Sequence, residues 1–116
     1  MKLVRVGKFG QEKPGVQTTN GILDVSSDFK DFDNSFFQNN GLENLKKKLQ
    51  QNKYPLFKEN ERLGSCVARP YKIICIGLNY FDHAKESGMA VPQEPIVFMK
   101  ATNVICGVAT WPDLYL

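Results

Sequence analysis

The sequence predicts a mixed α+β fold in which short strands outnumber short helices, and three patterns indicate it. Residues 2–6, KLVRV, alternate apolar and basic side chains, as a half-buried strand does. Residues 72–76, KIICI, form a continuous run rich in β-branched side chains. Residues 41–51 place leucines on one face of a helix. At 116 residues the chain fits one ordinary domain or two very small ones.

The first half of the chain predicts a small β-rich module. Its first strand is followed by a turn in GQEKPG, residues 10–15, and by a hairpin in VQTTNGILDV, residues 16–25. Asn20-Gly21 is a dipeptide that type I′ turns prefer. Residues 26–40 are aromatic and acidic without clean periodicity, so we expect a loop with one turn of helix.

A helix is expected at 41–51, with Asn40 as its N-cap. Glu43 lies four residues before Lys47, which suits an ion pair along the helix. The run Lys46–Lys48 is then the solvated face of this helix. Residues 54–71 carry turn and extended patterns and are expected to dock on the sheet as a connector. The apolar stripe of the helix consists of Leu42, Leu45 and Leu49.

The second half changes character at residue 72. The run 72–76 predicts a buried strand. Asn79 or Asp82 can cap a short helix that ends near Gly88, which suits a left-handed position. Two prolines, Pro92 and Pro95, then force an extended crossing. Further buried strands are expected at 95–100 and 103–106.

Composition excludes several classes of protein. The 42% hydrophobic and 23% charged residues are typical of a soluble globular protein. No apolar stretch approaches the roughly 20 residues that span a bilayer, and the N-terminus lacks a signal-peptide pattern. We therefore expect a cytoplasmic protein without a membrane partner. A net charge of +3 and one lysine run do not make a nucleic-acid surface.

The cysteines predict no metal site. Cys66, Cys75 and Cys106 include no C-x-x-C pair, and a single histidine cannot complete a Cys/His zinc set. Cys75 and Cys106 lie in apolar runs and are expected to be small buried side chains.

The one histidine, His83, is the principal candidate for catalysis. On a helix it shares a face with Glu86, three residues on, and such a carboxylate raises the basicity of an imidazole. The alternative is a capped surface helix whose histidine makes a local hydrogen bond. A metal site from Asp82, His83 and Glu86 is less favoured, because adjacent helical residues point about 100° apart.

A longer ordered pattern favours the catalytic interpretation. The segment 77–88 reads G-L-N-Y-x-D-H-A-x-E-x-G, and P-x-E-P-x-x-F-x-K follows at 92–100. Together with MKLVRVGKFGQEKPGV, GILDVSS and RLGSCVARPYK upstream, it resembles the fumarylacetoacetate hydrolase family. The closest likeness is to its bacterial ureidoglycolate lyase-like branch of diketo- and sugar-acid hydrolases.

The resemblance implies a fold, a reaction and site residues. It implies a small N-terminal β-rich domain at 1–70 and, at 71–107, the first strands and lid helix of a β-roll. It implies hydrolysis or lysis of carbon–carbon bonds in diketo or 2-oxo acids with Mg²⁺, Mn²⁺ or Ca²⁺. His83 matches the general base and Glu86 its orienting carboxylate, on a lid helix. Asn79 and Tyr80 match the pocket rim. Lys100 matches a substrate-binding lysine, with a solvated strand end as the alternative.

The chain departs from the family after Gly107. The family's metal ligands, an E-x-E pair and a later aspartate, lie downstream of that position, and residues 108–116, VATWPDLYL, resemble none of it. The acidic run 59–61 reads as solvated surface, and the aspartates of 24–33 lack the family context. We therefore expect a C-terminally truncated relative without metal ligands and with little turnover. The alternative is a non-catalytic interaction module. Such a module would pair through an exposed sheet edge, either with a second copy of itself or with a full-length relative.

Overall fold

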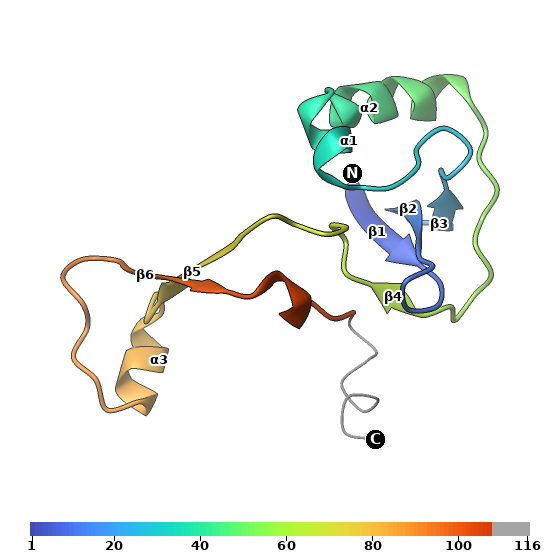
Figure 1. Ribbon diagram of the computed structural model, residues 1–116. Coiled ribbons are helices and arrows are strands. Elements are labelled where there is room, and N and C mark those ends of the chain that lie inside the picture. Colours follow the sequence, from blue (N-terminus) through green and yellow to red (C-terminus); the bar gives the residue numbers. More distant parts are fainter. Residues whose placement is uncertain (108–116) are drawn as a thin grey trace. The chain divides into compact units, whose positions relative to one another are not determined.

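The computed structural model describes residues 1–107 and divides the chain into two compact units (Figure 1). The N-terminal unit comprises Met1–Pro70 and the segment that begins at Ile105. The hairpin unit comprises Tyr71–Val104. The predicted tail at 108–116 lies outside the described residues. The α+β fold class is confirmed, because antiparallel sheets and short helices make up both units.

A four-stranded antiparallel sheet forms the base of the N-terminal unit. Its strands, in spatial order, are β3 (Gly21–Asp24), β2 (Lys13–Thr18), β1 (Lys2–Val6) and β4 (Leu63–Gly64). The strand predicted at 2–6 is confirmed as β1, and the predicted connector supplies the short edge strand β4, as expected of a segment that docks on the sheet.

The hairpin of β2 and β3 is confirmed, but its turn differs from the prediction. Thr18 faces Gly21 in the ladder, so Thr19 and Asn20 form the two-residue loop instead of Asn20-Gly21. Neither loop residue has a positive φ, so the type I′ prediction is wrong. The Thr18 hydroxyl accepts a hydrogen bond from the Asn20 N–H at 3.2 Å, which stabilises the loop by a side-chain contact instead.

The turn predicted at 10–15 is also displaced. Pro14 and Gly15 belong to β2, and the chain turns before them, at 7–10. A β-carbon at Gly15 would lie 2.8 Å from Ile22 Cγ2 and 3.0 Å from Phe57 Cε2. Gly15 is therefore present because two side chains close over the strand, not because the chain reverses there.

Two helices cover the sheet of this unit. The short helix α1 (Asn34–Gln38) begins where the Asp33 carboxylate accepts the Phe36 N–H at 3.1 Å. It supplies the single helical turn expected in 26–40. The second helix, α2 (Gly41–Gln51), has the predicted bounds. Asn40 does precede it, but in a left-handed conformation with no side-chain hydrogen bond, so the predicted cap contact is wrong.

The core of the N-terminal unit lies between the sheet and these helices. Phe32 and Phe36 meet edge to face at 4.9 Å between ring centres, and Leu45 from α2 is fully buried beside them. Of the predicted leucine stripe, Leu45 is buried, Leu49 is half-buried and Leu42 is exposed. Glu43 forms an ion pair with Lys46 at 2.6 Å, not with Lys47 as predicted. The buried core cluster is Val16, Val25, Phe32, Phe36 and Leu45.

The hairpin unit is a two-stranded antiparallel sheet with one short helix. Its elements are β5 (Ile73–Gly77), α3 (Phe81–Glu86), β6 (Ile96–Lys100) and the 3-10 helix η1 (Thr102–Val104). The strands predicted at 72–76 and 95–100 are confirmed as paired neighbours. The strand predicted at 103–106 is wrong, because η1 includes residues 103 and 104, and residues 105 and 106 form no strand.

Burial of these strands was predicted wrongly. Every residue of β6 is exposed, and β5 alternates half-buried with exposed residues. A β-branched run indicates a strand that can be buried, but its sequence does not specify whether another layer of the protein covers it. Cys106 is likewise exposed and Cys75 is half-buried, instead of both being buried. No helix among the described residues has the length and hydropathy to cross a membrane.

Candidate active site

The helix α3 carries both predicted catalytic residues and has a well-defined end. Its C-terminus is a Schellman motif, in which the Gly88 N–H donates to the Lys85 carbonyl at 3.2 Å and the Met89 N–H to the Ala84 carbonyl at 3.0 Å. Gly88 adopts φ +65°, which confirms the predicted left-handed position. Ala84 is the buried residue of α3, and the other residues of the helix, His83 and Glu86 among them, are exposed.

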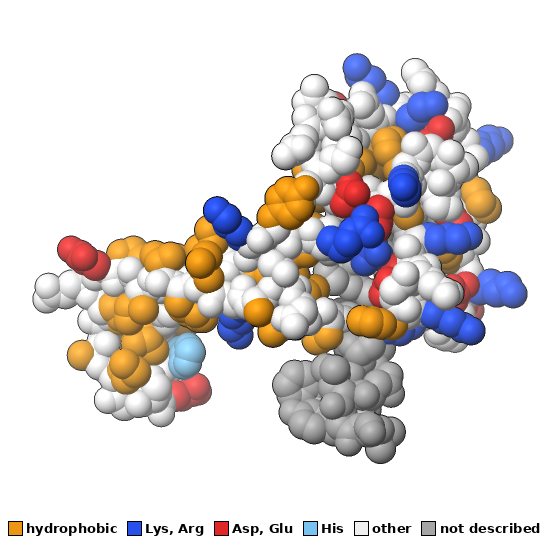
Figure 2. Space-filling model, viewed as in Figure 1, with side chains coloured by type: hydrophobic (Ala, Val, Ile, Leu, Met, Phe, Trp, Pro, Cys, Tyr) orange, Lys and Arg blue, Asp and Glu red, His pale blue; other side chains and the backbone are white. Residues whose placement is uncertain are grey.

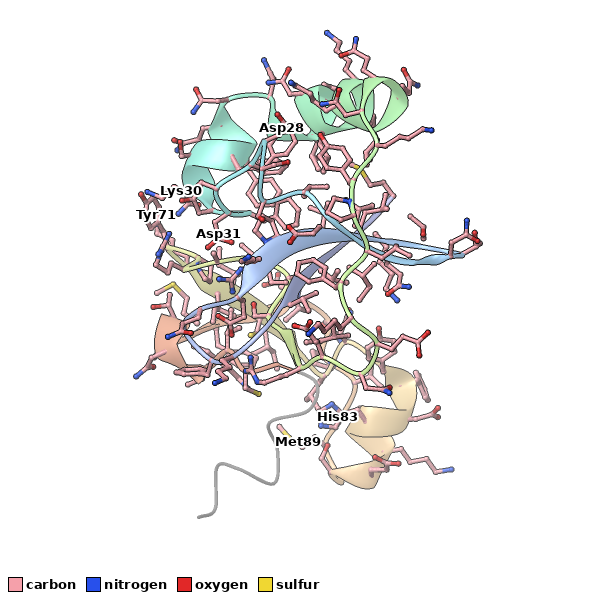
Figure 3. The ribbon with its side chains drawn as sticks, turned by 90° about the vertical axis from the view of Figure 1, so that its right-hand side faces the viewer. Asp28, Lys30, Asp31, Tyr71, His83 and Met89 are labelled. Carbon is pink, nitrogen blue, oxygen red and sulfur yellow. The ribbon has the colours of Figure 1, made fainter. Side chains whose placement is uncertain are left out.

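His83 and Glu86 lie three residues apart on this helix and are both exposed. That spacing puts them on one face. Within residues 1–107, however, no hydrogen bond or ion pair joins the imidazole to the carboxylate, and neither side chain has another such partner. Figure 3 shows His83 on α3. The two groups are therefore adjacent and accessible but do not form a closed dyad.

Asn79 and Tyr80 lie in the short link from β5 to α3, and both are exposed. Tyr80 is the N-cap residue of α3 and makes no side-chain cap bond, so neither Asn79 nor Asp82 caps the helix as predicted. The residue before them, Leu78, adopts φ +51°. This left-handed conformation is costly for a leucine, and no sequence pattern pointed to it.

Lys100 ends β6 opposite Ile73. The chain leaves β5 toward α3 at the other end of the ladder, where Gly77 faces Ile96. At about 3.3 Å per residue, the four-residue offset separates the two ends of the sheet by roughly 13 Å. Lys100 has no ion pair among the described residues. No contact in the hairpin unit brings this ammonium group to His83.

The acidic residues of 24–33 are engaged in structural contacts. Arg5 Nε donates to Asp31 Oδ1 at 2.7 Å and Arg5 Nη2 to Asp31 Oδ2 at 3.1 Å, a bidentate pair. Asp28 accepts from the Tyr54 hydroxyl and, at 3.3 Å, from Lys48 Nζ. The hydrogen bond from Tyr54 lowers the pKa of Asp28 despite the opposing effect of desolvation. These carboxylates therefore tie loops to the sheet and to α2.

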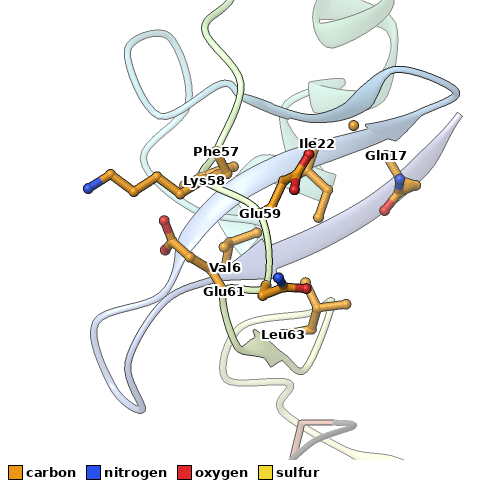
Figure 4. Close-up of a pocket in the computed structure, with 10 residues that line it drawn as sticks. Val6, Gln17, Ile22, Phe57, Lys58, Glu59, Glu61 and Leu63 are labelled. Atoms are coloured by element: carbon orange, nitrogen blue, oxygen red, sulfur yellow. The ribbon is translucent and has the colours of Figure 1, made fainter.

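Residues 1–107 contain no cluster of three or more His, Cys, Asp or Glu side chains placed to hold a metal ion. Glu59 and Glu61 lie in the exposed connector, as predicted for 59–61. They border a hollow of about 380 Å³ in the N-terminal unit (Figure 4). Its base is formed by β1 and β3, where Val6 and Ile22 face it, and Lys58 adds a cation at the rim. Sequence reasoning missed this hollow, since it arises from packing between distant segments.

No known family description matches the chain. The chain is 47% identical over 108 residues to a protein of Burkholderia ambifaria named "Putative hydrolase", and equally identical to a protein of Burkholderia multivorans named "Putative hydrolase/". Each match covers 92% of this chain and 38% of the relative. The chain thus spans little more than a third of the length of the curated relatives it matches.

A solved structure shares the fold. It is described as a "putative HpcE protein" from Mycobacterium smegmatis and superposes with a TM-score of 0.68 at 23% identity. The superposition covers 91% of this chain and 38% of that one. The described fold is therefore the fold of a part of that larger protein, and in sequence the chain is similar to part of the two Burkholderia proteins.

Proposed function

We propose that this chain forms the acid–base part of a cytoplasmic, hydrolase-type enzyme of the fumarylacetoacetate hydrolase family, which cleaves carbon–carbon bonds in diketo or 2-oxo acids. The observation that carries the proposal is the 47% identity over 108 residues to proteins named as hydrolases. A match that covers 92% of a 116-residue chain necessarily includes the ordered pattern at 77–100. In this proposal residues 1–70 are the N-terminal domain and 71–107 begin the catalytic domain.

The proposed mechanism uses α3 as the carrier of the base. His83 removes a proton from a water molecule, which attacks the substrate carbonyl, and Glu86 orients and stabilises the imidazolium that forms. Support comes from their common helical face and from side chains that are exposed and have no competing partner among the described residues. Asn79 and Tyr80 form the rim of the pocket. Lys100, at the other end of the β5–β6 ladder, binds the substrate carboxylate only if the substrate spans that distance. In this proposal the His83–Glu86 hydrogen bond forms only when substrate binds.

The backbone around α3 supports a role as a lid. Left-handed residues bound the segment on both sides, Leu78 at φ +51° and Gly88 at φ +65°. Such positions absorb backbone rotation when a lid closes. The helix itself is stiffened by its Schellman end, so it would move as one body.

The family resemblance implies a divalent ion, but residues 1–107 do not assemble a ligand set that fits one. No step through a metal is therefore derived from this chain. In the proposal the ligands belong to the part of the relatives outside the matched stretch. The same reasoning predicts little or no turnover by the 116-residue chain alone.

A chimera tests the proposal. In the Burkholderia ambifaria protein, the matched stretch is replaced by residues 1–107 of this chain, and hydrolysis of an acylpyruvate is followed with and without Mg²⁺. The expected result is Mg²⁺-dependent cleavage by the chimera and none by the 116-residue chain. A folded chimera that leaves a panel of diketo and 2-oxo acids intact, where the Burkholderia protein cleaves one, would contradict the proposal.

A second candidate function is a non-catalytic interaction module. It is favoured by the unpaired outer edges of β5 and β6, each of which has one partner strand within the described residues. The edge of β5, IICIG, carries no charge and no proline, the devices that usually block edge pairing. Co-elution of this chain with the intact Burkholderia ambifaria protein, without any activity of the chimera, would support this function instead.

A further inference from the structure

One face of the β5–β6 hairpin consists of apolar side chains that contact solvent. Ile74 lies directly opposite Met99, and Ile76 opposite Val97, so all four side chains point to the same face. They are 62%, 69%, 46% and 62% exposed, respectively. We call these four residues the hairpin face. Figure 2 shows the orange hydrophobic side chains that gather over this unit.

This surface is unusual for a stable folded unit. An isolated two-stranded sheet is marginally stable at best in water, and three or more strands or a covering helix are normally required. Contiguous exposed apolar patches commonly mark interaction sites. Between Ile73 and Gly77, and between Ile96 and Met99, no side chain carries a charge. The hairpin face therefore favours an apolar polypeptide layer and not a nucleic acid or a charged surface.

The length of the relatives indicates which polypeptide that is. The 108 matched residues make up 38% of the Burkholderia ambifaria protein, and the superposed part makes up 38% of the Mycobacterium smegmatis chain. The hairpin therefore occurs in those proteins beside a much larger amount of chain. A second copy of this chain is the competing occupant, and the oligomeric state of the chain alone distinguishes the two.

We propose that the hairpin face is the docking surface for the part of a hydrolase-type chain outside the matched stretch, which adds a strand-bearing apolar layer to β5 and β6. This inference rests on the proposed function, because it takes the Burkholderia proteins as the guide to the partner. It goes further by assigning the contact to Ile74, Ile76, Val97 and Met99. The same contact would hold α3 at the rim of the completed site.

Association of two separate polypeptides tests the docking surface. The 116-residue chain is co-expressed with the part of the Burkholderia ambifaria protein outside the matched stretch, and the mixture is analysed by size-exclusion chromatography with light scattering. A 1:1 complex is expected. Ile76→Glu and Val97→Glu, which place a charge at one cross-strand pair, should weaken it at least tenfold. Leu42→Glu, an exposed leucine of α2 in the N-terminal unit, is the matched control and should leave it unchanged.

Several outcomes overturn the inference. One is the absence of a complex between soluble, folded polypeptides, and another is a complex that Ile76→Glu and Val97→Glu leave unchanged. A homodimer of this chain that either substitution dissolves would assign the face to a second copy instead. If the separate partner is insoluble, the same substitutions are made in the chimera. Unaltered thermal stability of the substituted chimera then counts against the docking surface.

The test separates this inference from the proposed function. A complex that depends on the hairpin face but cleaves no oxo acid supports the docking surface and counts against the enzymatic proposal. An active chimera whose stability and activity are unchanged by Ile76→Glu and Val97→Glu supports the enzymatic proposal and overturns the docking surface.

Discussion

Replacing Asp31 by asparagine tests the ion pairs that hold the N-terminal unit together. The Asp31 carboxylate accepts two hydrogen bonds from the Arg5 guanidinium, at 2.7 and 3.1 Å, and one from the Phe32 N–H at 2.9 Å. Both charged side chains are only 12% exposed, so solvent screens the pair weakly. The amide of asparagine keeps one acceptor oxygen and loses the charge.

The expected cost follows from these contacts. A hydrogen bond to a charged group contributes about 1.5–3 kcal/mol, and Arg5 retains a weaker contact with Glu12 at 3.6 Å. We therefore expect Asp31→Asn to lower the free energy of unfolding by about 2 kcal/mol. For a unit the size of Met1–Pro70, this corresponds to a fall in melting temperature of roughly 8–16 °C.

Thermal unfolding at pH 7, followed by circular dichroism, measures this change. The matched control is Glu43→Gln, which removes an exposed ion pair with Lys46 on α2. Such surface pairs contribute little to stability, so this variant should have the melting temperature of the wild type. Equal melting temperatures for Asp31→Asn and Glu43→Gln would refute the reasoning that burial makes the Arg5 pair important.

Three further predictions concern pH, packing and metal binding. Burial raises the pKa of Glu12, but the hydrogen bond from Arg62 and the charges of Arg62 and Arg5 outweigh it, so the folded pKa lies below 4.5. The stability that Glu12 contributes is then present above pH 4.5 and lost as pH falls below it. In urea unfolding below pH 4.5, the free energy of unfolding of Glu12→Gln should therefore depend less on pH than that of the wild type. Gly107→Ala would place a β-carbon 2.1 Å from the Leu63 carbonyl oxygen, so it should lower the melting temperature by several degrees; an unchanged value would show that the backbone can yield. Calorimetric titration of the 116-residue chain with Mn²⁺ should detect no micromolar site, and one such site would contradict the proposal that metal ligands lie outside this chain.

Local patterns in the sequence predicted much of the secondary structure. The alternation in KLVRV and the leucine spacing of 41–51 gave the observed bounds of β1 and α2, because each depends on neighbours along the chain. Gly88 was recognised as the helix end for the same reason. The turn at Thr19 and Asn20 was missed, since a hydrogen bond from the Asn20 N–H to the Thr18 hydroxyl replaced the expected glycine turn.

Properties that depend on distant segments were not predictable in this way. The Arg5–Asp31 pair joins residues 26 positions apart, and nothing in either local sequence marks it. The exposure of β5 and β6 depends on which layer covers them, so their apolar composition alone suggested burial. At the candidate site, helical spacing placed His83 and Glu86 on one face, but their separation as side chains is set by rotamers and partners beyond α3.

The most direct measurement compares kcat of the chimera with kcat of its His83→Asn variant on an acylpyruvate, with Lys47→Ala on α2 as the control. If His83 is the general base, His83→Asn lowers kcat by about 10²–10⁴-fold, while Lys47→Ala has no effect. A His83→Asn chimera that folds and turns over as fast as the unsubstituted chimera would contradict the central claim.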